Sequence, residues 1–210
     1  MESLQINEVQ ISDLRRSLDF EIFSDKRRQH ILNVEKCAIE LGKIFLPREI
    51  IKLQAAALLH DITKEFSESE QISIISDAKI IVDADTLLTP SVLHSITAPY
   101  IVKRDFIEFA TDNVLSAIEK HTLGDVKMSV FDKIIFLADF IEETRNYPDS
   151  VATRNFVTES MRKDRIDENI LILDRACIME FKSTVAHLSK IGKNINKRSY
   201  LAMNSLISKS

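Results

Sequence analysis

Apolar residues recur every three or four positions along most of the chain, which is the spacing of one face of an α-helix. Val34, Ala38, Leu41 and Phe45 form one such stripe. We expect helices over about 6–18, 24–45, 47–61, 67–76, 111–121, 150–163 and 167–189, others around His94 and Asp139, and a short one after the polar linker GKNINKRS. The segment KIIVDADTLLTPS is expected to be a connection with one or two helical turns.

Several predicted helices begin with a side chain suited to that position. Ser24 and Thr111 can each accept a hydrogen bond from a backbone N–H of the first turn. Ser67 and Glu70 have the spacing of a capping box. Pro47 is expected in the first turn of the helix that runs through QAAALLHD, because an N–H is not needed there.

Composition supports an all-α fold. The 210 residues include only three Gly and four Pro, and they contain no Asn-Gly or Gly-Gly hairpin signal. With 45% hydrophobic residues, the chain can bury the core of one domain. We expect an N-terminal helical extension (1–23), a main domain (24–190) and a C-terminal linker with a short helix (191–210).

Charge and cysteine content limit the classes of binding partner and indicate the cellular compartment. The formal net charge of -4 lacks the basic excess of a nucleic-acid-binding domain. Neither a membrane span nor a signal peptide is evident, and Cys37 and Cys177 lie far apart on apolar faces, as reduced core thiols do. These features predict a cytoplasmic protein with no nucleic-acid or membrane partner; an exposed helix face would allow a homodimer.

One carboxylate stands out in the apolar run KIIFLADFIEE, whose helix Ser129 can cap. Asp139 has apolar neighbours on both sides, so no wide polar face can turn it toward water. A buried carboxylate needs a paired cation, several hydrogen bonds or a metal ion. The run therefore predicts a partner for Asp139 in the interior.

Four of the five histidines also lie on apolar helix faces. His30, His60 and His121 continue apolar stripes, His94 follows Val92 and Leu93, and Asp61 comes directly after His60. A single inward histidine is more often a core residue bound to a carbonyl. Five helices that each bring ionisable groups inward favour a common metal centre, because one centre would satisfy them all. The fifth, His187, lies in a mixed polar region and is expected at the surface.

The order of these residues, H, HD, H, H, D, resembles that of the HD-domain metal-dependent phosphohydrolases. The stretches RRQHILNVEKCAIEL, LLHDITK, VLHSITAPYIV and AIEKHTLGDVKMSVFDKIIFLADFIEETRNYP look like the YqeK-type branch. Members of that branch are symmetrical diadenosine tetraphosphate hydrolases with a two-iron centre. The resemblance runs from about Ser24 to Ile195 and implies an HD-domain helical bundle.

The resemblance also implies a metal content and a reaction. It implies two divalent or mixed-valence ions, iron first. Manganese, cobalt or zinc are alternatives, because the donors are imidazoles and carboxylates without a thiolate. One ion would be held by His30, His60, Asp61 and Asp139, and the other by Asp61, His94 and His121. A hydroxide bridging the ions would attack the tetraphosphate between its central phosphoryl groups and release two ADP.

A polyphosphate needs cations besides the metals. Lys64 lies one turn after Asp61, Arg27 three residues before His30, and Arg145 six residues after Asp139. These three positions match basic positions of the family, although lysine and arginine are mostly solvated in proteins. We expect all three to bind substrate, and we expect Asp61, Lys64 and Arg145 to act directly in catalysis.

Three further residues are substrate-binding candidates. Lys133 is a weaker candidate cation than the other three. Thr122 and Gly124 follow His121, where a close backbone approach to a phosphate is feasible. Gly124 is equally what an ordinary helix C-cap requires.

The chain departs from the family pattern at several positions. Glu143 and Thr144 replace a common Pro-Gly pair and add charge beside a site for a polyanion. Pro99 lies inside the helix that carries His94, where a bend would displace the histidine. Asn196 stands where a histidine is common, which puts in question a contribution of the C-terminal segment to the substrate site.

Two other functions stay open from the sequence. A different HD phosphohydrolase, acting on a nucleoside monophosphate, an alarmone or a cyclic dinucleotide, would share the ligands and differ in its pocket walls. The lack of an adjacent GYP stretch counts against the cyclic-dinucleotide branch. A non-catalytic protein that binds metal and nucleotide without turnover is the third alternative.

Overall fold

A computed structural model of the chain describes residues 6–18, 23–162 and 165–208. Within these residues the structure is all-helical, with eleven α-helices, two short 3₁₀ helices and no strand, which confirms the all-α prediction. The elements are α1 (Glu8–Ser17), α2 (Asp25–Phe45), α3 (Ile50–Leu59), α4 (Glu68–Asp77), α5 (Ala84–Leu87), η1 (Pro90–Val92), α6 (Leu93–Asp105), η2 (Ile107–Phe109), α7 (Asp112–Lys120), α8 (Val130–Ile141), α9 (Pro148–Ser160), α10 (Ile166–Lys190) and α11 (Lys197–Ile207).

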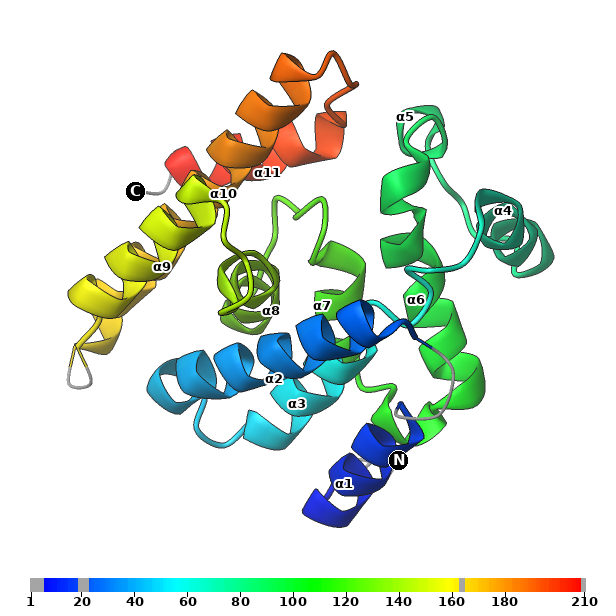
Figure 1. The fold of residues 1–210 in the computed structure, drawn as a ribbon, viewed down its shortest axis with the longest axis horizontal. Helices are drawn as coiled ribbons and strands as arrows, with labels where there is room; N and C mark the ends of the chain where they lie inside the picture. Colours follow the sequence, from blue (N-terminus) through cyan, green and yellow to red (C-terminus); the bar gives the residue numbers. More distant parts are fainter. Residues whose placement is uncertain (1–5, 19–22, 163–164, 209–210) are drawn as a thin grey trace.

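Helix α8 forms the centre of the bundle. It packs against α2, α3, α7, α9 and α10, and Figure 1 shows it in the middle, viewed nearly along its axis. Ile134, Ile135 and Leu137 are completely buried, as is Ala138. The apolar run around Asp139 is therefore the centre of the hydrophobic core. Burial of each of its large aliphatic side chains stabilises the fold by about 1.5–3 kcal/mol.

The predicted caps of three helices are present. Ser24 accepts a hydrogen bond from the backbone N–H of Arg27 at the start of α2. Ser67 and Glu70 form the expected capping box of α4. Ser129 caps α8, where Asp132 completes a second capping box.

The structure corrects one predicted helix start and one predicted capping bond. Helix α3 begins at Ile50, three residues after Pro47, because α2 ends at Phe45 and a turn follows, in which the N–H of Glu49 donates to the carbonyl of Leu46. Thr111 does occupy the N-cap position of α7, but its side chain makes no capping hydrogen bond. Both differences arise in turns, whose geometry depends on tertiary packing and not on local propensity.

The predicted N-terminal extension joins the core. Ile11 and Leu14 of α1 are buried in the same hydrophobic cluster as α2 and α3. Arg15 binds Glu35 of α2 through both guanidinium and carboxylate atoms, with Nε 3.0 Å from Oε2, and Gln54 of α3 donates to Glu35 Oε1 at 3.0 Å. A buried carboxylate thus fixes the orientation of α1 on two helices.

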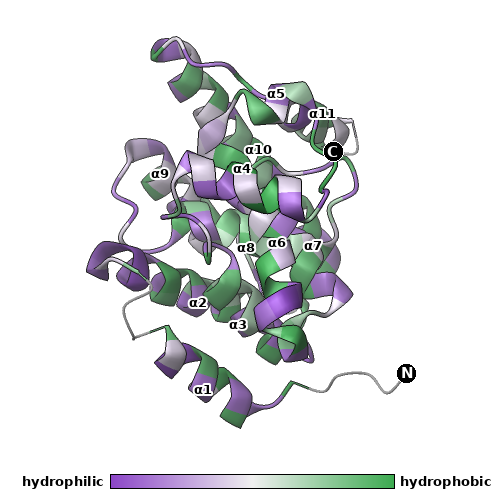
Figure 2. Ribbon diagram, turned by 90° about the vertical axis from the view of Figure 1, so that its right-hand side faces the viewer, coloured by the Kyte–Doolittle hydropathy of each residue, from purple (hydrophilic) through white to green (hydrophobic). Residues whose placement is uncertain are grey.

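The last helix is tied to the α5 segment. Asn196 caps α11 by accepting from the N–H of Arg198, and its amide donates to Thr86 Oγ1 at 3.0 Å. Asp85 accepts from Asn194 Nδ2 at 2.6 Å and from the N–H of Lys197 at 2.7 Å. Figure 2 shows α5 and α11 side by side at one end of the molecule. Asn196 therefore has a structural role in this chain, because it caps α11 and joins it to α5.

Other sequence expectations concern single residues. Cys37 and Cys177 are both free thiols, Cys37 partly buried and Cys177 completely buried. His187 is exposed, as predicted. Across the described ranges, every helix is too short or too polar to cross a membrane.

Candidate metal centre

The predicted ligands meet in the interior, carried by five helices. His30 lies on α2, His94 on α6 and Asp139 on α8. His60 and His121 are the C-cap residues of α3 and α7. All four histidines and Asp61 are buried, and Asp139 is half-buried.

Asp61 stands between two pairs of histidines. Its Oδ2 atom lies 3.4 Å from His60 Nε2 and 3.7 Å from His30 Nε2. Its Oδ1 atom lies 3.4 Å from His94 Nε2 and 3.5 Å from His121 Nε2. Each carboxylate oxygen thus faces a different pair of imidazoles, which is the arrangement of a carboxylate that can bridge two metal ions.

Asp139 completes one side of the cluster. Its Oδ1 atom lies 3.0 Å from His30 Nε2, and His30, His60 and Asp139 place one donor atom each within 4.8 Å of one another. The same spacing holds for His60, Asp61 and His121. The carboxylate in the apolar run of α8 therefore faces this centre.

Hydrogen bonds fix which ring nitrogens point inward. Nδ1 of His60 lies 2.7 Å from the carbonyl of Ala57, and Nδ1 of His121 lies 2.6 Å from the carbonyl of Ile118. A carbonyl can only accept, so each Nδ1 carries a proton, and in the neutral ring that binds metal each Nε2 keeps its lone pair. His60 Nε2 is buried without a hydrogen-bond partner. An inward lone pair beside carboxylates matches a metal ligand, so the residues present fit a metal ion.

The carboxylates of the centre are held in their charged form. Burial disfavours charge on Asp61, but the neighbouring histidines, His60 foremost, outweigh burial and hold its pKa well below the usual value. Burial also opposes charge on Asp139, yet His30 and Arg145 lower its pKa well below the usual value. Ionised carboxylates are the form that binds metal.

The three predicted substrate cations lie against these ligands. Arg27 forms an ion pair with Asp61 Oδ2. Arg145 Nη2 lies 2.7 Å from Asp139 Oδ1 and 3.5 Å from His30 Nε2. Lys64 Nζ lies 3.3 Å from His94 Nδ1, and burial lowers the pKa of this lysine. Positive charge is therefore concentrated around the candidate metal centre.

The three remaining substrate candidates lie in different environments. Thr122 is at the centre, with Oγ1 3.0 Å from His94 Nε2 and 2.9 Å from His121 Nε2. Lys133 instead forms a 2.5 Å ion pair with Asp174 of α10. Gly124 has a φ of 66°, and a Cβ at this position would meet the ring of Phe181. The structure thus brings Thr122 to the histidines and places Lys133 and Gly124 in packing contacts with α10.

Sequence reasoning missed Glu142. This buried residue caps the end of α8, and its Oε1 lies 3.1 Å from His30 Nδ1, on the opposite side of the ring from Asp139. Thr144 donates to it through its N–H and its hydroxyl, each at 2.6 Å. A signal was present in the sequence, because Glu142 follows Asp139 by three residues, one helical turn later.

The departures from the family pattern are accommodated locally. Glu143 forms a 2.8 Å ion pair with Lys36 on the surface. Helix α6 continues through Pro99, and His94 Nε2 still lies 3.1 Å from His121 Nε2. The expected displacement of His94 is therefore not observed.

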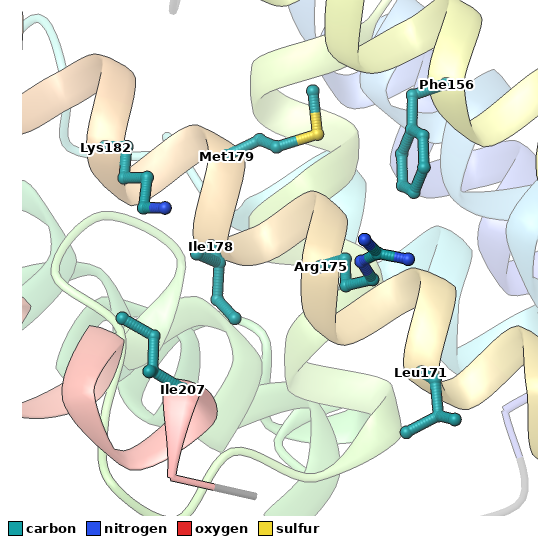
Figure 3. Close-up of a pocket in the computed structure, with 7 residues that line it drawn as sticks. All are labelled: Phe156, Leu171, Arg175, Ile178, Met179, Lys182 and Ile207. Atoms are coloured by element: carbon teal, nitrogen blue, oxygen red, sulfur yellow. The ribbon is translucent and has the colours of Figure 1, made fainter. Parts of the chain in front are cut away.

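A cavity lies away from the candidate metal centre. Its volume is about 620 Å³, and Figure 3 shows that it is lined by residues of α9, α10 and α11: Phe156, Leu171, Arg175, Ile178, Met179, Lys182 and Ile207. None of the predicted site residues lines it. A second cavity, of about 440 Å³, lies between α2 and α9 and borders Glu142.

Comparison with known proteins gives a consistent match. The HD domain family model matches residues 27–144. A symmetrical bis(5'-nucleosyl)-tetraphosphatase of Bacillus subtilis is 28% identical over 188 residues, which cover 88% of this chain and 91% of that protein. The protein of the same name from Halalkalibacterium halodurans is 34% identical over 129 residues, and the match covers 60% of this chain and 65% of the relative, slightly less than two thirds.

A solved structure resembles the whole chain. It is that of a Clostridium acetobutylicum protein described as a predicted HD superfamily hydrolase involved in NAD metabolism. The TM-score is 0.80 at 26% identity, and the match covers 97% of this chain and 98% of the other.

Proposed function

This chain belongs to the HD domain family, and we propose that it is a metal-dependent hydrolase that splits diadenosine tetraphosphate symmetrically into two ADP. Two relatives that bear the name symmetrical bis(5'-nucleosyl)-tetraphosphatase support the substrate and the position of cleavage. The six candidate ligand residues lie together, five of them buried and Asp139 half-buried, which supports catalysis over passive binding.

One observation carries the proposal, namely the position of Asp61. Its two oxygens face two different histidine pairs at 3.4–3.7 Å. A structural metal site needs no bridging carboxylate, whereas two-metal phosphoryl transfer uses one to hold both ions at the reacting group.

We propose two ions, iron first, with manganese, cobalt or zinc as alternatives. His30, His60, Asp61 and Asp139 would hold one, and Asp61, His94 and His121 the other. Both thiols lie outside the cluster, which leaves the nitrogen and oxygen donors that borderline divalent metals accept. When bound, the ions would polarise phosphoryl oxygens and activate a water molecule.

The protein's own side chains bind and orient the substrate. Arg27, Lys64 and Arg145 would bind the oxygens of the tetraphosphate and neutralise its charge, since charge-assisted hydrogen bonds to phosphate are strong and directional. The Thr122 hydroxyl would donate a further hydrogen bond beside His94 and His121. With its phosphates held by these groups, the substrate would present a central phosphorus to the centre, and cleavage there would leave two phosphates on each adenosine.

The test is a metal count together with product analysis. The protein is purified without a chelating tag, bound metals are measured by elemental analysis, and diadenosine tetraphosphate turnover is followed by chromatography. About two metals per chain with ADP as sole product are expected. AMP plus ATP would contradict symmetrical cleavage, and metal without turnover would point to another phosphate substrate.

A further inference from the structure

The segment Glu142–Arg145 is held by an arginine from the next helix. Arg154 of α9 donates from Nε to the carbonyl of Ile141 at 2.5 Å. Its Nη2 atom donates to the carbonyls of Glu142 at 2.5 Å and of Arg145 at 2.7 Å. One guanidinium group thus binds three backbone carbonyls, two at the end of α8 and one at the end of the segment.

This segment carries two side chains that touch the metal centre. Glu142 faces His30 Nδ1, and Arg145 faces Asp139 Oδ1. The N–H of Arg145 also donates to the carbonyl of Glu142 at 3.0 Å, so the segment is a closed turn. A shift of this turn would move the partner of His30 and the guanidinium of Arg145 together.

We propose that Arg154 is a positioning residue for catalysis. By binding both ends of the turn, it sets the direction of Glu142 toward His30 and of Arg145 toward the substrate. The orientation of Arg145 toward substrate rests on the function proposed above. The orientation of Glu142 toward His30 affects metal affinity alone and can be tested without any nucleotide.

The bonding pattern exceeds what capping of a helix requires. The last carbonyls of an α-helix lack partners within the helix, and water or a basic side chain commonly satisfies them. Arg154 also binds the carbonyl of Arg145, four residues beyond the end of α8. A planar guanidinium can bind these acceptors at once, whereas a lysine ammonium offers a single nitrogen.

The surroundings of Arg154 permit a chemical rescue. Arg154 and Glu142 both line the cavity of about 440 Å³ between α2 and α9. Arg154 is only half-buried, so its truncation would open this space further and let free guanidinium ion reach the three carbonyls. A group that acts only through overall stability would not be replaced in this way.

The experiment compares Arg154→Ala, Arg154→Lys and Arg175→Ala, the last being a matched arginine on α10 that lines the other cavity. We expect kcat/KM for diadenosine tetraphosphate to fall by about 10–100-fold in Arg154→Ala, the usual range for residues that orient metal ligands. Guanidinium chloride at about 50 mM, far below denaturing molar concentrations, should restore most of the loss. Arg154→Lys should recover less than half of it, and Arg175→Ala should behave as wild type with or without guanidinium.

A second readout separates this proposal from the proposed function. Cobalt(II) affinity, followed by visible absorption, should fall in Arg154→Ala and recover with guanidinium, even if the wild type proves inactive on the tetraphosphate. The proposal is overturned if cobalt affinity stays within twofold of wild type, or if a loss is accompanied by a lower melting temperature and shows no rescue. Should Arg154→Ala fail to fold, the cobalt affinity and kcat/KM of Arg154→Lys decide, because wild-type values there would exclude a positioning role.

Discussion

His30 Nδ1 lies 3.1 Å from Glu142 Oε1, so the imidazole is held between a carboxylate on each side. Burial disfavours the charged ring, but Asp139 and Glu142 outweigh it and raise the pKa of His30. In the metal-bound form Nδ1–H would donate to the Glu142 carboxylate, while Nε2 would supply its lone pair to the metal.

Glu142→Gln should therefore lower metal affinity. An amide is a weaker acceptor for Nδ1–H than a carboxylate, so we expect a loss of about 10–100-fold. Titration with cobalt(II) measures it. The adjacent Glu143→Gln is the matched control, because Glu143 pairs with Lys36 on the surface, and an equal loss in both variants would contradict this role.

Asp139→Ala should release metal and abolish hydrolysis. The substitution removes the oxygen that lies 3.0 Å from His30 Nε2 and leaves Arg145 with Glu142 as its remaining carboxylate partner. Elemental analysis and turnover measure the two effects. Asp105→Ala, at the exposed end of α6, should keep the wild-type metal content, and normal activity in Asp139→Ala would remove Asp139 from the metal centre.

Lys64→Ala and Arg145→Ala should separate substrate binding from metal binding. Each variant removes a cation that is proposed to bind the tetraphosphate, and a hydrogen bond to a charged group contributes about 1.5–3 kcal/mol, or roughly 10–100-fold in kcat/KM. The loss should be larger for diadenosine tetraphosphate than for a small chromogenic phosphate ester, with metal content retained. Equal losses on both substrates would argue against a role in binding the polyphosphate.

Gly124→Ala and Gly192→Ala form a matched pair for stability. Both glycines have positive φ, which costs an L-residue about 1–2 kcal/mol. Only at Gly124 would the new Cβ meet a ring, that of Phe181, which adds about 1–3 kcal/mol of overpacking. Urea unfolding should show the larger loss for Gly124→Ala, and equal losses would mean that Phe181 moves aside freely.

Cys37 should react slowly with iodoacetamide in the folded protein. Burial raises its pKa to about 12, so at pH 8 only about one molecule in 10⁴ carries the reactive thiolate. Mass spectrometry should show labelling that rises about tenfold for each pH unit up to pH 10, and that becomes fast after unfolding in urea. Rapid native labelling at pH 8 would contradict this environment.

The inward position of the candidate ligands could be predicted because each of them lies on, or directly after, an apolar helix face. His30 continues the stripe of Val34 and Ala38, and such a stripe fixes which side of a helix points inward. Ser24 and Ser67 likewise define helix starts through bonds within four residues. These features are local, so periodicity and capping rules suffice to find them.

Ion pairs and hydrogen bonds between different helices cannot be predicted from such local features. Lys133 lies on the inward face of α8 together with its apolar neighbours. The sequence does not specify that Asp174 of α10 lies opposite. The bonds from Arg154 to three carbonyls depend on how α9 turns back along α8. Partners that are far apart in sequence are determined by packing, which helix periodicity does not encode.

The link between Asp85 and the start of α11 has a consequence for biosynthesis. Asp85 binds Asn194 and the N–H of Lys197, which are 109 and 112 residues later in the chain. When the α5 segment leaves the ribosome, its partners have not yet been translated, so this contact can form only after nearly all of the described chain has emerged. Contacts of such long sequence separation form slowly, since a long loop must first close. The α5 segment should therefore become resistant to protease only after the start of α11 has been translated.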